Sequence, residues 1–499
     1  MKRINDKKLY GALYLCAGLI CIFLLLFSKV NFIIVMEINS IIWLITTVFR
    51  YKESIYENLH KIIFWLIVIP GLFYILISPS APIYGYDETT HYKAIVSLEG
   101  NFTGKINPAD EITIGYYGQH SADVVSHDGQ LSLEELQDKT YKEKSDIAYT
   151  GESLNWQNMK NLISYSPYLF GRWIGELLKL NYSSIYRFSK FINLSVYAVL
   201  ISLAIKTTKS YKTILSCIGT LPLIVFEAAS YQYDPFLIGN LLLGFSLFIR
   251  CYEERKIALK KIIAIVGFIT LGLTVKPVYF PIMIPMLFMD PSFFENKKQQ
   301  KLFHRLLLIS MLLMIIYIFL PAITGDLGAG DVRGGTDVNA TEQVYFILNN
   351  PVKYGSILIK YMIKEYLNPF LAFGYIVPMG SIGIITISIV PFFLLVCGTL
   401  FNGNVFFHNS KYQIVTWISW LISVSLVITS LYVSFTGVAS ENVSGVQLRY
   451  HLPVLVMIMT LFKGKVNDKK AGAIYAVLFA LVMSLVFIMY MGNYFYAMN

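Results

Sequence analysis

Residues 62–77 read IIFWLIVIPGLFYILI, an apolar run that ends at Ser78-Pro79-Ser80-Ala81-Pro82. The sequence DETTHY follows at residues 87–92 and places two carboxylates and an imidazole close behind that run. The run is near the length at which a helix crosses a bilayer, and charges beside a bilayer cost free energy unless they face water, a partner or a substrate. The stretch therefore predicts a membrane-spanning helix that leads into a catalytic centre at the membrane surface.

The rest of the chain has the composition of a membrane protein. It has 499 residues, of which 56% are hydrophobic and 14% are charged, whereas a soluble domain carries about 25% charged residues. The apolar residues form long uncharged blocks near spanning length, which are 262–274, 306–320, 382–400, 414–433 and 471–491. These features predict an all-α polytopic membrane protein.

The positions of lysine and arginine predict its orientation. Basic residues gather around Lys2, Arg50, Lys206, Arg250, Lys297, Lys411 and Lys463. Placing all of these inside the cell requires about thirteen spans, with the N-terminus in and the C-terminus out. The polar loops 80–164 and 322–368 and the segment 434–449 then lie outside. The net charge of +10 reflects this bias, so it does not indicate nucleic-acid binding.

Three regions follow along the chain. Residues 1–60 are predicted to form an accessory transmembrane hairpin with spans at about 9–29 and 33–49, the first of them uncleaved rather than a signal peptide. Residues 61–460 form the transmembrane core, and 461–499 a C-terminal transmembrane helix. The five cysteines lie in or beside spans without a CxxC spacing, which argues against structural disulfides and a cysteine-ligated metal.

The first large extracytoplasmic loop is predicted to carry short surface helices. Residues 131–141 read as an amphipathic helix, in which Ser132 and Glu135 have the spacing of a capping box. Residues 165–180 fit better as a helix at the outer surface than as a span. A loop of this length is usually functional.

Asp87 is the first candidate for chemistry. On a helix that begins near Tyr86, Asp87 and His91 share a face and Glu88 is turned to one side. A carboxylate there could accept a proton from a hydroxyl nucleophile, or these three residues could ligate Mg²⁺ or Mn²⁺; no cofactor is otherwise indicated. The alternative is that Asp87 caps the helix N-terminus.

A second carboxylate, Asp234, lies at the outer ends of two neighbouring predicted spans, level with Asp87. It could help to position an acceptor or a metal. Since Pro235 follows it, the alternative is again a helix cap.

Arg449 and Lys276 are placed outside by the same topology, against the charge bias. A phosphate group would hold them there, because guanidinium offers bidentate donors. The alternative for Arg449 is an interfacial side chain that reaches toward water.

Four blocks of the sequence resemble a known family. They are Asp87–Ala94 with Gly100, Tyr165–Gly171, Leu221–Asp234, and Gly445–Tyr450 with Pro453. Their order and spacing resemble the GT-C superfamily of membrane glycosyltransferases and, more closely, the bacterial family of predicted membrane proteins called domain of unknown function 2142. The resemblance implies a polyprenyl-phosphate-sugar donor, an acceptor on the outer face and Asp87 as the base.

Together these features predict a membrane glycosyltransferase of the bacterial cytoplasmic membrane that acts in cell-surface polysaccharide biosynthesis. Asp87, Glu88 and Asp234 are the predicted catalytic residues. The predicted substrate-binding residues are His91, Tyr165, Lys276, Arg449 and Tyr450. The predicted partners are membrane lipid, the lipid-linked donor and a glycan or lipid acceptor. A polymerase of lipid-linked repeats and a lipid-linked glycan flippase or transporter are the alternatives.

Overall fold

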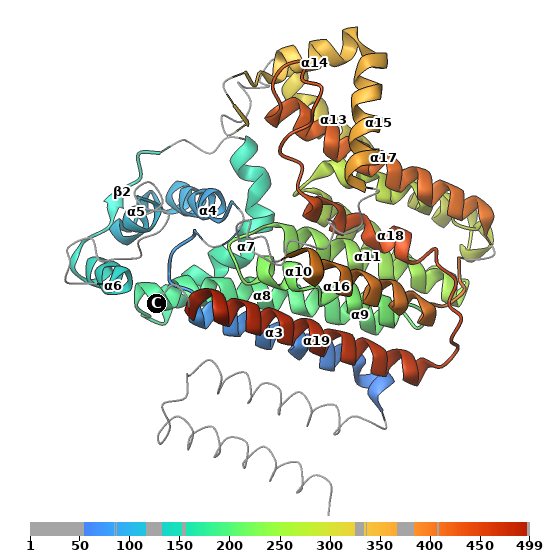
Figure 1. Ribbon diagram of the computed structural model, residues 1–499, viewed down its shortest axis with the longest axis horizontal. Helices are drawn as coiled ribbons and strands as arrows, with labels where there is room; N and C mark the ends of the chain where they lie inside the picture. Colours follow the sequence, from blue (N-terminus) through green and yellow to red (C-terminus); the bar gives the residue numbers. More distant parts are fainter. Residues whose placement is uncertain are drawn as a thin grey trace, which may run out of the picture. The chain divides into compact units, whose positions relative to one another are not determined.

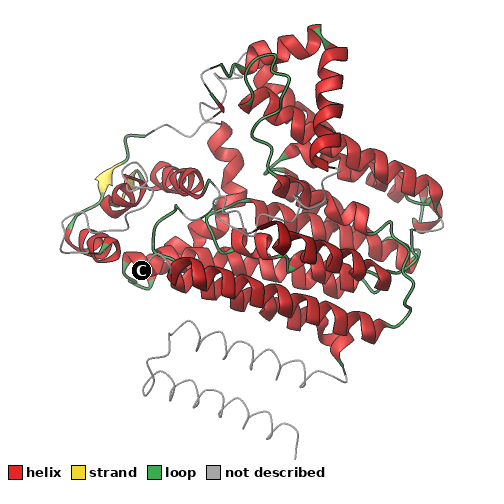
Figure 2. Ribbon diagram, viewed as in Figure 1, coloured by secondary structure: helices red, strands yellow, loops and turns green. Residues whose placement is uncertain are grey.

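The computed structural model describes residues 54–83, 85, 87–115, 132–151, 156–324, 334–335, 337–366, 384–406 and 409–496. Within them, almost every regular element is a helix (Figure 2). Figure 1 labels these helices and strands along the chain. The chain forms two compact units. Unit 1 contains Met1–Lys206, Gly219–Phe236 and Asp468–Asn499, and unit 2 contains Thr207–Ile218 and Leu237–Asn467.

Six helices in the described part of the chain are long and apolar enough to cross a membrane. They are α3 (Ile55–Ile77), α8 (Tyr182–Thr207), α11 (Asp234–Glu254), α13 (Lys297–Thr324), α17 (Ser410–Phe435) and α19 (Lys469–Tyr496). The prediction of a polytopic helical membrane protein is therefore confirmed. The total of about thirteen spans, the loop layout and the three-region division stay predictions, and the predicted spans at 9–29 and 33–49 lie outside the described residues.

Unit 1 is built on two parallel helices, α3 and α19. Lys469 lies over the Tyr56 ring near their starts, and the Ser484 hydroxyl donates to the Leu66 carbonyl at 3.2 Å farther along. The remaining elements of unit 1 are α4 (Glu88–Thr103), β1 (Lys105–Ile106), α5 (Pro108–Gly115), α6 (Leu133–Glu143), β2 (Ile147–Ala148), α7 (Trp156–Leu177), α8 and α10 (Pro222–Ala228).

Local sequence signals set the boundaries of the segment after α3. The helix α3 ends at Ser78, which adopts an extended conformation before Pro79, as expected for a residue that precedes proline. The helix α4 ends at Gly104, whose φ of 73° suits glycine. The strands β1 and β2 pair antiparallel and so hold together the two ends of the α5–α6 segment.

The predicted capping box is confirmed. The Ser132 hydroxyl accepts a hydrogen bond from the Glu135 backbone N–H, and the Glu135 carboxylate accepts one from the Ser132 backbone N–H. The helix α6 begins directly after Ser132 and buries Leu133, Gln137 and Thr140.

The helix α7 packs closely on α8 where the sequence offers a glycine. A Cβ atom at Gly171 would lie 2.7 Å from the Ser189 Cα atom, so no other residue fits without moving the helices apart. The helix α7 is not among the six candidate spans, and the surface position expected for residues 165–180 stays a prediction.

Unit 2 surrounds a proline-rich helix, η2 (Pro277–Phe288), a 3₁₀ helix with Pro281 and Pro285 in its interior. It packs against α13 and α17. The other elements of unit 2 are α9 (Lys212–Gly219), α11, α12 (Leu259–Leu273), η3 (Pro291–Phe293), α14 (Ala340–Asn349), α15 (Pro351–Tyr366), α16 (Ile384–Gly398), η5 (Thr399–Phe401), η6 (Leu448–Val454) and α18 (Leu455–Met459).

Candidate functional site

Asp87 occupies the position before the first residue of α4 and has a left-handed backbone, with φ of 52° and ψ of 19°. The helix begins at Glu88, two residues later than predicted. The Asp87 side chain makes no capping hydrogen bond to the helix. The side-chain hydrogen bond that defines a helix cap is therefore absent, and only the attraction of a carboxylate to the helix N-terminus remains of the capping alternative.

Glu88 is buried and points into the protein. Its carboxylate pairs with the Lys190 ammonium group at 2.8 Å and accepts hydrogen bonds from the backbone N–H groups of Gly85 and Tyr231 at 2.8 and 3.1 Å. These contacts favour a structural role for Glu88, in which it fixes the start of α4, over the predicted role in holding an acceptor or a metal.

Lys190, the partner of Glu88, was not predicted. It lies in α8, is 1% exposed and packs against aromatic rings, with distances to the ring centroids of 4.7 Å for Tyr186, 5.4 Å for Tyr231 and 5.9 Å for Tyr74. A buried cation needs such partners to offset its lost hydration. In the sequence, Lys190 is one lysine within an apolar helix, and nothing there names Glu88 as its partner.

His91 and Tyr165, both predicted to bind substrate, lie in contact with each other. The His91 Nδ1 atom is hydrogen-bonded to the Tyr165 hydroxyl at 2.5 Å. The His91 ring also packs edge-on against Tyr233, with centroids 4.4 Å apart. Burial raises the pKa of Tyr165 well above its usual value, and the nearby Tyr233, Tyr168 and Asp234 act in the same direction.

Asp234 belongs to the same neighbourhood. It is 5% exposed, it follows Tyr233 in the chain, and its charge acts on Tyr165. The structure thus brings the start of α4, the helix α7 and the turn between α10 and α11 to one place in unit 1.

The turn before Asp234 contains a residue that sequence reasoning missed, Gln232. It is 1% exposed, and neither its side-chain nitrogen nor its side-chain oxygen has a hydrogen-bond partner among the described residues. Its backbone is fixed by Tyr168, whose hydroxyl accepts from the Gln232 N–H at 2.9 Å and lies 2.8 Å from the Gln232 carbonyl oxygen. Leaving a buried amide unsatisfied costs about 1–3 kcal/mol, so this side chain is a candidate for binding a polar ligand.

Unit 2 holds the two predicted phosphate-binding cations against one ring. The Lys276 ammonium lies 4.4 Å and the Arg449 guanidinium 5.3 Å from the centroid of the Tyr450 ring. Arg449 is buried, and the Tyr279 hydroxyl donates to the Tyr450 carbonyl at 2.5 Å, which fixes η6 on η2. Gly445 has a φ of 80°, and a Cβ atom there would lie 2.4 Å from the Phe435 ring, so glycine allows the chain to turn into this segment.

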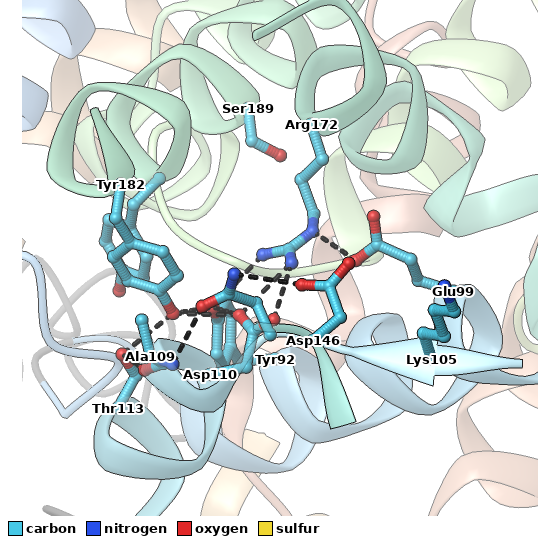
Figure 3. Close-up of polar contacts among 12 residues, drawn as sticks. Tyr92, Glu99, Lys105, Ala109, Asp110, Thr113, Asp146, Arg172, Tyr182 and Ser189 are labelled. Carbon is cyan, nitrogen blue, oxygen red and sulfur yellow. Dashed lines mark hydrogen bonds and ion pairs between the residues drawn. The ribbon is translucent and has the colours of Figure 1, made fainter. Parts of the chain in front are cut away.

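A second buried charge network in unit 1 was also missed (Figure 3). The Arg172 guanidinium pairs with Glu99 at 2.6 Å and Asp110 at 2.9 Å, and the hydroxyls of Tyr92 and Tyr182 donate to Asp110 at 2.6 and 2.8 Å. The five residues lie on α4, α5, α7 and α8. The network therefore ties the segment after α3 to the helices that follow it.

The pKa values of this network follow from its burial. Burial disfavours the Arg172 cation, but Asp110 and Glu99 more than offset this and raise its pKa well above the usual value. Burial raises the pKa of Glu99, against the opposing effect of Arg172. Partial burial, and then the charge of Glu99, raise the pKa of Glu176 to about 7.

The predicted ligands for a divalent cation do not come together. Among the described residues, no group of three or more His, Cys, Asp or Glu side chains could hold a metal ion. Glu88 is directed at Lys190, and His91 at Tyr165. These contacts do not support a metal held by Asp87, Glu88 and His91.

Comparison with known proteins identifies one family. The family described as "Predicted membrane protein (DUF2142)" matches residues 69–458, which is most of the chain. No curated protein and no solved structure matches this chain. The resemblance of the four sequence blocks to this family is confirmed.

Proposed function

We propose that this chain, which belongs to the predicted membrane protein family DUF2142, is a glycosyltransferase of the GT-C type. It moves a sugar from a polyprenyl-phosphate carrier to a glycan or lipid acceptor on the outer face of the bacterial cytoplasmic membrane. The observation that carries the proposal is Asp87, a carboxylate held in a left-handed turn next to a spanning helix and not used as a helix cap.

Asp87 is assigned the role of general base. In the reaction, the oxygen of an acceptor hydroxyl bonds to the anomeric carbon of the sugar while the bond from that carbon to the carrier phosphate breaks. The hydroxyl proton goes to the Asp87 carboxylate. A positioned base contributes about 10²- to 10⁴-fold to such a step.

Asp234 and Gln232 are assigned to the acceptor. A sugar hydroxyl both donates and accepts hydrogen bonds, and it could meet the two unsatisfied atoms of the buried Gln232 amide. His91, Tyr165 and Tyr233 pack beside this turn and would limit the shape of the acceptor.

Lys276 and Arg449 are assigned to the carrier phosphate, which gains negative charge as the sugar leaves. Two cations on one ring repel each other, and a phosphate offsets that repulsion while it accepts hydrogen bonds from both. The guanidinium is suited to bidentate binding of phosphate. Both cations contact the Tyr450 ring, which restricts where they lie.

The experiment compares surface glycans of a deletion strain complemented with wild type, Asp87→Asn or Glu111→Gln, at matched membrane levels. Glu111 is an exposed carboxylate on α5, so its variant controls for loss of a charge in the same segment. We expect one sugar to disappear in the deletion strain and with Asp87→Asn, and to return with wild type and Glu111→Gln.

The pattern of products separates this function from its rivals. A polymerase defect leaves single repeat units on the cell surface, and a flippase defect leaves complete lipid-linked intermediates inside the cell. Either pattern, or full complementation by Asp87→Asn, contradicts the assignment of Asp87 as the base of a sugar transferase.

A further inference from the structure

A groove of about 660 Å³ opens along the first turns of α13, and its described lining includes none of the residues assigned to sugar transfer. Its described lining comes from one face of this helix. Lys301, His304 and Arg305 form the polar part, and Leu308, Ile309 and Leu312 form the apolar part. A helix face that changes from cationic to apolar along its length matches the structure of an anionic lipid.

The two basic side chains of the groove form no ion pair with any acidic residue that the structure describes. Lys301 and Arg305 are exposed and lie one helical turn apart. Neither forms an ion pair with a carboxylate in the described part of the chain, and Glu295, the acid nearest in sequence, pairs instead with Lys256 at 3.5 Å. The groove therefore presents uncompensated positive charge.

The third polar residue of the groove, His304, is held in place by two contacts with backbone carbonyls. Its Nδ1 and Nε2 atoms lie 2.8 and 3.0 Å from the carbonyl oxygens of Gln300 and Leu287. These contacts hold the ring between the first turn of α13 and the end of η2. Lys411 lies over the ring of Phe288, the residue after Leu287, at 4.9 Å.

The apolar part of the groove continues along the helix. Leu308, Ile309 and Leu312 are 54%, 47% and 56% exposed. With a rise of about 1.5 Å per residue, Lys301 and Leu312 are about 16 Å apart along the axis. This is about half the thickness of a bilayer core, so an acyl chain whose phosphate lies at Lys301 would run beside the three apolar residues.

We propose that this groove binds one anionic phospholipid, with its phosphate between Lys301 and Arg305 and an acyl chain along Leu308, Ile309 and Leu312. The bias of basic residues toward the cytoplasm predicts that the lipid belongs to the inner leaflet. The site is independent of the proposed sugar transfer, because it uses none of the residues assigned to that reaction.

The test uses the full-length protein purified in detergent, with bound lipid measured by native mass spectrometry after addition of phosphatidylglycerol or phosphatidylcholine. The variants are Lys301→Ala/Arg305→Ala and, as a matched control, Lys297→Ala/Lys298→Ala, which removes the same charge from exposed positions of the same helix. At about one kcal/mol for each basic residue, the groove variant should bind phosphatidylglycerol roughly thirtyfold more weakly.

Wild type and the control variant should both prefer phosphatidylglycerol to phosphatidylcholine, and circular dichroism should show equal helix content in all three proteins. Equal losses in the two double variants would contradict the proposal, since they would indicate general charge attraction. So would equal binding of the two lipids, or competition by inorganic phosphate as strong as that by phosphatidylglycerol. A second variant, Leu312→Asp, should weaken lipid binding while leaving both cations in place.

Discussion

Asp87 and Gln232 are two residues whose conformation or environment costs free energy. A non-glycine residue with positive φ is uncommon, although aspartate tolerates it better than most, and Asp87 adopts this conformation without forming a cap. Gln232 buries an amide with no partner among the described residues. Costs of this kind concentrate at functional sites, which supports placing both residues at the acceptor.

Replacing Gln232 with Met should separate stability from function. The side chain keeps a similar volume and loses the unsatisfied amide. The free energy of unfolding in detergent should therefore stay level or rise by about 1 kcal/mol. Sugar transfer should fall, because the acceptor loses its hydrogen bonds. The control is Gln137→Met, which removes an amide that donates to the Ser80 carbonyl and the Thr113 hydroxyl and should therefore destabilise the protein. Unchanged transfer by Gln232→Met would remove this residue from the acceptor site.

At the scale of elements, the start of α4 depends on its ion pair with α8. Breaking a buried pair leaves an uncompensated charge and costs about 3–5 kcal/mol. Lys190→Met should lower the free energy of unfolding by that amount, because Glu88 loses its partner. The double variant Glu88→Gln/Lys190→Met should recover much of the loss. Denaturant unfolding of wild type, Glu88→Gln, Lys190→Met and the double variant provides the cycle. A double variant as unstable as Lys190→Met would show that the unpaired Glu88 charge is not the cause of the loss.

The carboxyl of Glu176, on α7, makes the stability of the folded protein depend on pH. Its folded-state pKa of about 7 is raised from the ordinary 4.5, so the protonated form favours folding. The stability it contributes is fully present below pH 4.5, decreases as pH rises toward 7, and is absent above that. The melting temperature of wild type should therefore fall relative to Glu176→Gln across this window. A constant difference between the two proteins would show that Glu176 does not titrate there.

The sequence predicted the helices better than the ion pairs that join them. The candidate spanning helices and the Ser132–Glu135 capping box follow from composition and local spacing. The ion pairs Glu88–Lys190 and Arg172–Asp110 join residues far apart in the chain, and a sequence without an alignment does not specify such pairs. This is why Lys190 and Arg172 were missed, whereas the catalytic role of Glu88 stays a prediction.

At the scale of the whole molecule, the described residues contain six helices able to span a membrane. Their orientation is a prediction from the charge bias alone. A variant without the five native cysteines allows a test with single cysteines at Asp146, in the predicted outer segment, and at Lys298, at a predicted inner helix end. A membrane-impermeant maleimide should label the first in intact cells and the second only after permeabilisation. Labelling of Lys298→Cys in intact cells would reverse the topology and the proposed side of the reaction.

The most direct measurement is sugar transfer by the purified protein in vesicles, with a set of radiolabelled polyprenyl-phosphate sugars and acceptor glycolipids from the deletion strain. Wild type and Glu111→Gln should transfer label from one donor and release polyprenyl phosphate. Asp87→Asn should transfer it at least about 100-fold more slowly while keeping the same melting temperature. Equal rates for Asp87→Asn and wild type, or no release of polyprenyl phosphate from any donor by wild type, would contradict the account.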